Sequence, residues 1–290
     1  MNALNTYGDI YIKTRKILRD QKIEQSDLEA RLICSAACEK SVMAFLRDSR
    51  MYVTDETYLD TVKAMLRRRL RGEPVAYITG SWEFYGLPMK VTRDVLIPRV
   101  DTEVLAERAI AFCRLQPEKT VRVLDLCSGT GCVGIAIAVH APNASVLLGD
   151  VSPKALAVGR SNVLHNNVTQ TVRSMQIDAL AGVDSHIGKF DLITANPPYI
   201  PSRDIERLDH SVRDYEPHLA LDGGGDGLDF YRAITANFRE VLNPGGGLFY
   251  EVGIHQASPV AALMRQYGFE KIGFAQDTLG IDRVVYGRLQ

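Results

Sequence analysis

The stretch Asp191-Leu-Ile-Thr-Ala-Asn-Pro-Pro-Tyr199 indicates how the C-terminal part of the chain folds. Its apolar run is typical of a buried strand. That strand must end at Asn196, because neither Pro197 nor Pro198 can donate to a sheet ladder. A simple exit from strand to turn would need only an Asn-Pro pair. The longer motif places an amide, two rigid residues and the ring of Tyr199 at the strand's carboxyl end, where open α/β sheets bind ligands.

Alternating strand and helix patterns surround this stretch from Val121 onward and predict a doubly wound sheet. Helices are expected from about residue 101, over 133–139, around Leu156 to Val163, over 228–242 and up to about Tyr267. The predicted strands are 121–126, 145–149, 171–177, 190–195, 248–252, 271–275 and 281–287, the last two paired. The segment 200–227, rich in charge, proline and glycine, shows no obvious element, and such loops are usually functional or disordered.

The first seventy or so residues have helical spacing throughout and predict a small bundle. Ser26 and Glu29 form a capping-box pattern, and Ser41 is expected to cap a short helix. The side chains expected to face inward are Tyr7, Ile10, Thr14, Ile17, Leu18, Leu28, Leu32, Ile33, Tyr58, Val62, Met65, Leu66 and Leu70. The basic run Arg67–Arg71 is either a solvated helix face or a contact for an acidic partner or RNA.

Short strand-like pieces follow at residues 77–79, 83–85 and 89–91, broken by glycine and proline, and predict a β-hairpin. This hairpin would link two domains. The predicted organisation is therefore a helical domain at 1–74, a β-hairpin linker at 75–98 and a catalytic α/β domain at 99–290.

Composition excludes several classes of protein. The 290 residues carry a net charge of −1, from 34 basic and 35 acidic side chains, which argues against a chain-wide footprint for nucleic acid. The five cysteines are scattered, so neither a disulfide framework nor a zinc site is expected, and Cys34 and Cys38 are interpreted as core packing. The histidines show no metal-binding spacing, and no signal peptide or membrane span is evident. A reduced, cytoplasmic setting is predicted, without a metal.

A glycine turn follows the first predicted strand. Gly129, Gly131 and Gly134 match the G-x-G-x-x-G pattern, and Asp150 follows about twenty residues on, as in sites for NAD or S-adenosylmethionine (SAM). Asp125, just before the turn, favours SAM, because a carboxylate repels a pyrophosphate but can hold an ammonium group through water. A third acid, Asp178, ends the third strand. Each acid alone is equally well explained as a cap of a helix or turn, but three at successive strand ends suit a sulfonium cofactor.

Asn196 can then hold a planar NH₂ group. The nitrogen of an amide or of an exocyclic amine is a poor nucleophile because its lone pair is delocalised. The side-chain oxygen of Asn196 and the carbonyl of Pro197 can accept its two N–H groups and stabilise the positive charge that grows during methyl transfer. Tyr199 can lie against the flat substrate. Arg99, in Leu96-Ile-Pro-Arg99, is either a surface charge or a cleft residue, and Asp101–Glu103 can cap the helix beside it.

These motifs resemble those of the peptide chain release factor N5-glutamine methyltransferases, the HemK/PrmC family, over the whole chain. The shared marks are Gly72–Gly80, Glu83-Phe84, Leu96–Arg99 with Asp101–Glu103, the glycine turn, Asn196–Ile200, Glu216-Pro217 with Ala220–Gly223, and Gly280 with Asp282-Arg283. The resemblance implies a class I SAM-dependent methyltransferase fold, Rossmann-like with a seven-stranded mixed sheet. It also implies class I release factors as partners, the glutamine of their Gly-Gly-Gln loop as substrate, and docking by the helical domain.

The resemblance also implies the site residues. Cofactor contacts are expected from Cys127, Ser128, Gly129, Thr130, Gly131, Asp150, Asp178, Ala179, Asn196 and Arg99, with S-adenosylhomocysteine as product. Catalysis is expected from Asn196, Pro197 and Tyr199, and glutamine binding from these three residues and Pro198. Two positions depart from the family pattern, because Cys127 stands where glycine is common and Val100 where proline is usual.

Other functions stay open at this point. A nucleic-acid adenine-N6 or guanine-N2 methyltransferase shares the Asn-Pro-Pro-Tyr motif, but the chain offers only Arg67–Arg71 as a basic recognition region. A non-catalytic module that binds SAM or a release factor, and an NAD dehydrogenase, are further alternatives. The interpretation followed here predicts no membrane and no direct nucleic-acid partner.

Overall fold

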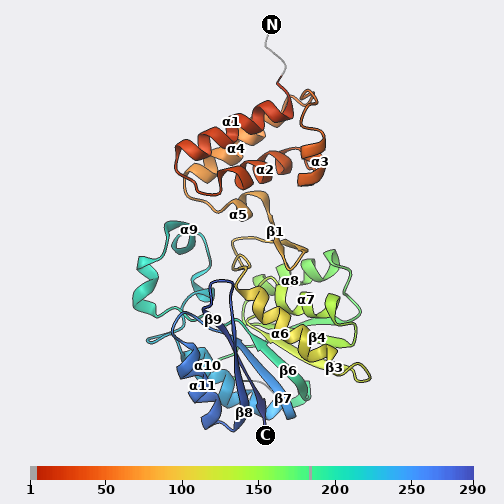
Figure 1. Cartoon of the computed structure of the whole chain (residues 1–290), viewed down its shortest axis with the longest axis vertical. Helices are drawn as coiled ribbons and strands as arrows, with labels where there is room; N and C mark the ends of the chain where they lie inside the picture. Colours follow the sequence, from red (N-terminus) through yellow and green to blue (C-terminus); the bar gives the residue numbers. More distant parts are fainter. Residues whose placement is uncertain (1–4, 183–184) are drawn as a thin grey trace. The chain divides into compact units, whose positions relative to one another are not determined.

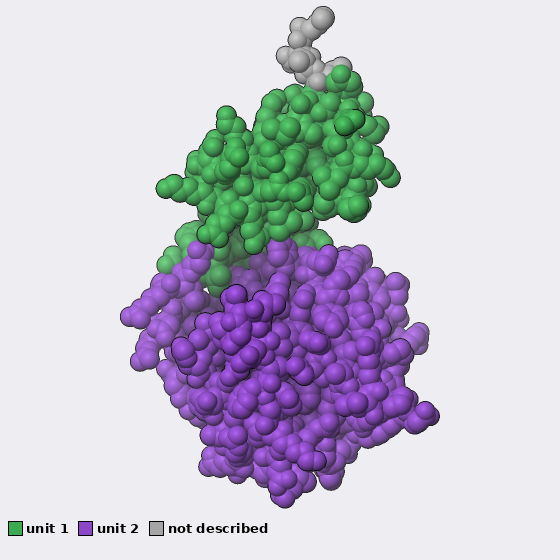
Figure 2. Space-filling view, in the orientation of Figure 1, with its two compact units in different colours: residues 1–81, 210–215 green, residues 82–209, 216–290 purple. Residues whose placement is uncertain are grey.

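The computed structural model describes residues 5–182 and 185–290, so residues 1–4 of the predicted helical domain lie outside it. The chain forms two compact units, residues up to 81 with 210–215, and residues 82–209 with 216–290 (Figure 2). The boundary between residues 81 and 82 falls inside the predicted linker, residues 75–98. Within the described ranges, none of the helices combines the length and hydrophobicity that crossing a bilayer requires.

The N-terminal unit is a helical bundle, as predicted (Figure 1). Its buried core includes Ile10, Leu18, Ile33, Phe45 and Tyr58. Its helices are α1 (Tyr7–Asp20), α2 (Ser26–Ala37), α3 (Val42–Arg47), α4 (Tyr58–Leu70), α5 (Val75–Thr79) and α9 (His210–Arg213).

The predicted capping box at Ser26 is wrong. Gln25 occupies the N-cap position of α2, and the carboxylate of Glu29 is bound by the guanidinium of Arg69 at 2.5 and 3.1 Å. A carboxylate held in this way cannot reach back to the start of its own helix. A capping box exists instead at α1, between Thr6 and Asp9.

Three side chains predicted to face inward are more than one third exposed: Ile17 at 41%, Leu28 at 42% and Leu70 at 44%. Helical spacing alone does not locate the edges of a buried stripe. Within the run Arg67–Arg71, Arg68 pairs with Glu73 and Arg69 with Glu29. These two charges therefore stabilise the bundle itself.

The predicted strand at 77–79 is also wrong, because Val75–Thr79 forms the single-turn helix α5. Pro74 precedes it with a φ of −57°, which suits a helix start. Gly80 ends it in the left-handed conformation, donating from its N–H to the carbonyl of Ala76 at 2.8 Å. The flanking proline and glycine outweigh the β-propensity of the residues between them.

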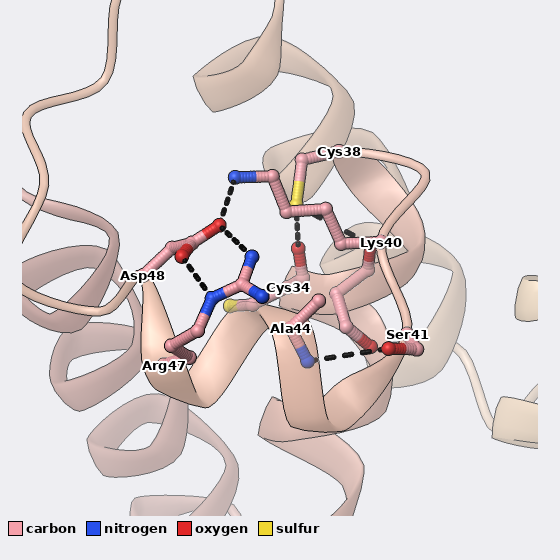
Figure 3. A network of polar contacts seen from close by, with 8 residues as sticks. Cys34, Cys38, Lys40, Ser41, Ala44, Arg47 and Asp48 are labelled. Carbon is pink, nitrogen blue, oxygen red and sulfur yellow. Dashed lines mark hydrogen bonds and ion pairs between the residues drawn. The ribbon is translucent and has the colours of Figure 1, made fainter.

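Figure 3 shows the polar contacts around α3. Ser41 caps this helix, as predicted, by accepting from the N–H of Ala44 at 3.2 Å. Lys40 and Arg47 both bind Asp48, at 2.9 and 2.8 Å, and hydrogen bonds from Arg47 and Lys40 lower the pKa of Asp48 to about 2. The thiol of Cys38 donates to the carbonyl of Cys34, so this pair belongs to the packing of the bundle.

The segment 200–227 is more structured than predicted. It contains the 3₁₀ helices η2 (Ser202–Arg207) and η3 (His218–Ala220), with α9 between them. The piece 210–215 belongs to the helical unit, where the hydroxyl of Tyr215 donates to the carbonyl of Arg71 at 3.1 Å. A contact with a residue so far away in the sequence cannot be predicted from the local sequence pattern.

The second unit is built on a seven-stranded sheet of order β5-β4-β3-β6-β7-β9-β8, in which β9 is antiparallel to both neighbours. This confirms the predicted fold class and the terminal strand pair. The strands are β3 (Val121–Leu126), β4 (Ala144–Asp150), β5 (Val172–Gln176), β6 (Phe190–Ala195), β7 (Leu242–Glu251), β8 (Phe269–Gln276) and β9 (Asp282–Leu289).

Helices cover both faces of this sheet (Figure 1). On one face lie α6 (Thr102–Arg114), α7 (Cys132–His140) and α8 (Pro153–His165), and on the other α10 (Asp229–Asn237) and α11 (Ala257–Gln266). α10 is shorter than predicted because the 3₁₀ helix η4 (Arg239–Val241) follows it, and β7 begins at Leu242 rather than 248. The glycine run 245–247 lies within β7, beside a register irregularity with β6.

The predicted hairpin is present as β1 (Ser81–Phe84) and β2 (Leu87–Lys90). Glu103 accepts from the N–H of Tyr85 at 2.8 Å, and Asn162 binds both the N–H and the carbonyl of Lys90, at 2.7 and 3.0 Å. The hairpin is thereby fixed to α6 and α8.

The centre of the sheet positions the site. Residue 126 of β3 pairs with residue 149 of β4 and with residue 195 of β6, all three strands being parallel. Three features therefore lie together at the carboxyl ends of the central strands, where the strand order reverses direction. They are the glycine turn after β3, Asp150 at the end of β4 and Asn196 after β6.

Candidate active site

A pocket of about 420 Å³ opens at this edge, and all of its lining residues belong to the α/β unit. Its volume lies in the range of roughly 300–1,000 Å³ that is typical of small-molecule sites. The predicted site residues that line it are Arg99, Cys127, Ser128, Gly129, Thr130, Asp150, Asp178, Ala179, Asn196 and Pro198, together with Asp125.

The glycine turn after β3 has an unusual backbone. Cys127 has a φ of 55°, Gly129 of 52° and Gly131 of 78°, all in the left-handed region. A Cβ on Gly131 would lie 2.9 Å from a methyl of Leu148, and one on Gly134 only 2.4 Å from another methyl of the same side chain. These glycines let α7 approach β4 closely. Cys127 adopts the left-handed conformation with a side chain, which explains why glycine would be favoured there.

Asp125 faces the pocket from β3 and is 2% exposed. Its carboxyl accepts from the N–H of Gly134 at 3.0 Å and from the hydroxyl of Thr194 at 2.8 Å. Burial raises its pKa to about 7, although both hydrogen bonds act against this shift. A cation placed in the pocket would stabilise the ionised form.

Asp150 ends β4 and holds the turn. Its two carboxyl oxygens accept from the N–H groups of Gly129 at 2.8 Å and Ser152 at 2.9 Å, which leaves one lone pair on each for a ligand. Burial raises its pKa. Beside it, the hydroxyl oxygen of Ser128 is buried and has no hydrogen-bond partner among the described residues.

The region after β5 is mostly apolar. Ile177 and Ala179 are buried there, whereas Asp178 is exposed and accepts from the N–H of Leu180 at 2.9 Å. Leu219 and Phe230 also line the pocket. Such a surface suits a flat aromatic group.

Asn196 follows β6 and is half-buried. Its side-chain nitrogen donates to the hydroxyl of Thr102 at 3.2 Å. Pro198 also lines the pocket, whereas Pro197 is buried and Tyr199 packs against the hydrophobic cluster between the sheet and α10–α11. The carbonyl of Tyr199 accepts from Gln256 at 2.9 Å, and burial raises the pKa of its phenol.

Arg99 lines the pocket, and its side chain is 38% exposed. Its guanidinium pairs with the carboxylate of Glu216, whose side chain is 1% exposed and also accepts from the N–H of Ile97 at 3.2 Å. Asp101 occupies the N-cap position of α6, but its side chain makes no cap hydrogen bond there, and its carboxylate pairs with Arg283 at 3.0 Å.

The donors and acceptors fit a sulfonium cofactor. The carboxyl groups of Asp125 and Asp150 suit an ammonium group and hydroxyl groups. The Ser128 hydroxyl, which has no partner among the described residues, is a further hydrogen-bonding group, and the apolar lining suits a flat base. Sequence reasoning missed two groups near Asn196: Thr102, seen only as part of a helix start, and Glu251 at the end of β7. Thr102 belongs to α6 and Glu251 to β7, both far from Asn196 in the sequence, so the local pattern does not indicate that they lie near it.

The profile described as "PrmC N-terminal domain" matches residues 9–80, and that described as "Methyltransferase small domain" matches residues 106–213. A release factor glutamine methyltransferase of Geobacter sulfurreducens is 41% identical over 276 residues, covering 95% of this chain and 94% of that protein. One of Clostridium acetobutylicum is 37% identical over 277 residues, covering 96% of each.

Two solved structures share the fold. The hMettl16 catalytic domain, in complex with MAT2A 3′UTR hairpin 6, has a TM-score of 0.56 at 15% identity, covering 81% of this chain and 83% of that one. A human methyltransferase 10 domain containing protein has a TM-score of 0.51 at 15% identity, covering 71% of this chain and 91% of that one. At such identities the likeness concerns the fold alone.

Proposed function

The chain belongs to the family of release factor glutamine methyltransferases, and on that premise we propose how its pocket performs the reaction. The protein transfers a methyl group from SAM to the side-chain amide nitrogen (N5) of the glutamine in the Gly-Gly-Gln motif of peptide chain release factors. One observation carries the assignment of its site: Asn196 and the glycine turn after β3 line the same pocket.

SAM supplies a methyl group on a positively charged sulfur. Asp125 would face its ammonium group, and the free lone pairs of Asp150 would accept from its ribose hydroxyls. Ser128 offers the buried hydroxyl that has no partner within the described part of the chain. Ile177 and Leu219 would enclose the adenine.

On the substrate side, the Asn196 side-chain oxygen and the Pro197 carbonyl would accept the two N–H groups of the glutamine amide. Both acceptors are held before the reaction, Asn196 by Thr102 and Pro197 by its ring and by burial. They hold the nitrogen towards the cofactor and stabilise the positive charge that develops on it. Tyr199 does not line the pocket, and its side chain packs instead against the hydrophobic cluster between the sheet and α10–α11. The alkylated nitrogen loses its proton readily, so a strong base is not required.

The helical domain at residues 1–74 would dock the release factor, in line with the "PrmC N-terminal domain" match over residues 9–80. Two of its arginines, Arg68 and Arg69, are already paired within the bundle, which gives no support to RNA recognition there. We place the protein with its partner in the cytoplasm.

Mass spectrometry of a purified class I release factor after incubation with this protein and SAM tests the proposal. We expect one added methyl group, located by fragmentation on the glutamine of the Gly-Gly-Gln loop. A parallel incubation with RNA and methyl-tritiated SAM is the counter-test. Labelled RNA and an unmodified release factor would overturn the proposal.

A further inference from the structure

We propose that Thr102 and Glu251 are positioning residues that determine which end of the Asn196 amide faces the pocket. The inference rests on the proposed function and concerns the same site. An asparagine amide has two ends of nearly equal size, one accepting and one donating. Only the oxygen end can receive the N–H groups of a substrate amide, so its orientation needs a cause.

The three groups come from different parts of the chain, and two of them, Asn196 and Thr102, line the pocket. Thr102 is the first residue of α6 and is 2% exposed, and its hydroxyl accepts from the side-chain nitrogen of Asn196 at 3.2 Å. Glu251 is the last residue of β7, also 2% exposed. Residue 195 of β6 pairs with residue 250 of β7, so Asn196 and Glu251 are the next residues on adjacent strands.

The carboxyl of Glu251 has few partners. Its Oε2 atom is buried without a hydrogen-bond partner in the described part of the chain. Burial raises the pKa of this carboxyl to about 7, and a hydrogen bond from the Thr102 hydroxyl acts against that shift. Two cations, Arg99 and Arg283, face this carboxyl. Arg99 is already paired with Glu216, and Arg283 is paired with Asp101 and Asp277.

The direction of the hydrogen bonds follows from counting hydrogens. A threonine hydroxyl has a single hydrogen, and an ionised carboxylate can only accept. At pH 8, where Glu251 is ionised and takes that hydrogen, Thr102 can offer Asn196 only a lone pair, so the variants below are compared at that pH. Asn196 must then turn its NH₂ end to Thr102, which leaves its oxygen for the substrate. The reversed amide would set two donors against each other, at the cost of an unmade buried hydrogen bond.

Thr102→Val tests this by removing the hydroxyl at nearly constant volume. We expect kcat for release-factor methylation to fall about tenfold or more, with the Kd for SAM changed less than about twofold. Thr102→Ser keeps the hydroxyl and should restore most of the rate. Thr235→Val is the matched control, because Thr235 is fully buried and bonded to Tyr250 at 2.9 Å on the other face of the sheet. It should lower thermal stability while leaving kcat within about twofold.

A double-mutant cycle separates positioning from packing. In an Asn196→Ala background, Thr102→Val should cause no further loss of kcat, since no amide remains to be oriented. Equal losses in both backgrounds, or a Thr102→Val enzyme within about twofold of wild type, would overturn the inference.

Glu251→Gln is a second variant for the case that Thr102→Val does not fold. The new amide can donate to Thr102 and free its hydrogen to point at Asn196, so the same loss of kcat is expected. Unchanged kcat in this variant would count against the inference. An inactive wild-type protein would instead be a failure of the proposed function, which keeps the two outcomes distinct.

Discussion

Asp125 is the residue whose charge depends most directly on what fills the pocket. Its carboxyl is 2% exposed, and burial raises its pKa to about 7. A bound cation favours the ionised form, so cofactor binding should lower this pKa and release protons near neutrality.

We therefore predict that the affinity for SAM rises about tenfold between pH 6 and pH 8, as Asp125 loses its proton. Isothermal titration calorimetry at several pH values, in buffers of different ionisation enthalpy, measures both the affinity and the protons released. Asp125→Asn should bind more weakly and with a flat pH profile. The same pH dependence in Asp125→Asn would show that another group is responsible.

Cys127 adopts a φ of 55°, a conformation that costs a residue with a Cβ about 1–2 kcal/mol. Cys127→Ala and Cys127→Gly both remove the thiol, but only glycine relieves this strain. We predict that Cys127→Gly is more stable than Cys127→Ala by about 1 kcal/mol in urea unfolding, despite the greater freedom of unfolded glycine. An alanine variant of equal or higher stability would contradict the strained backbone.

At the scale of elements, the stability of α5 depends on the residues at its two ends. Gly80 has a φ of 71°, and a Cβ there would meet nothing within 4 Å, so the cost of a side chain is conformational alone. Gly80→Ala should lower the free energy of unfolding by about 1 kcal/mol. Gly225→Ala is the control, since that site is equally open and lacks a positive φ. A Gly80→Ala loss no larger than the control's would argue against this helix end.

The sequence predicted elements well where one face is continuously apolar, as in β3 and β6. It also placed Asp125, Asp150 and Asn196 at the same edge, because strand ends in a parallel sheet converge. The prediction from sequence failed where a residue far away in the sequence determines the contact that a side chain makes. The spacing of Ser26 and Glu29 predicts a cap, but Glu29 instead pairs with Arg69, forty residues on, which the local pattern does not indicate. Thr102 begins α6, as the pattern predicts, but its hydrogen bond with Asn196, 94 residues on, cannot be predicted from the local sequence.

For the whole molecule, acids with shifted pKa values make stability depend on pH in opposite ways in the two units. Asp125 and Glu251 both have a pKa raised by burial to about 7, from 3.8 and 4.5. The folded state holds these protons more tightly, so their contribution to stability is present at acid pH and is lost as the pH rises to about 7. Asp48 in the helical unit has a pKa lowered to about 2, so its contribution is lost only as the pH falls from 3.8 towards that value.

We predict that the α/β unit of the cofactor-free protein is less stable at pH 7 than at pH 5, and that Asp125→Asn reduces this difference. Urea unfolding of the full chain, followed separately for each unit by hydrogen exchange, measures it. Two results together would contradict the effect of burial on the pKa of Asp125. The wild-type α/β unit would become more stable from pH 5 to pH 7, and Asp125→Asn would show the same dependence of stability on pH.

The central claim is that Asn196 holds the glutamine amide beside the cofactor pocket. The most direct measurement is the rate of methylation of an intact release factor by Asn196→Ala at saturating SAM, followed by mass spectrometry. Asn166→Ala is the control, since that amide bonds to the carbonyl of Pro88 at 3.0 Å, away from the pocket. We predict that Asn196→Ala lowers kcat by about a hundredfold while binding SAM normally, and that the control is unaffected. Methylation by Asn196→Ala at nearly the wild-type rate would contradict the account.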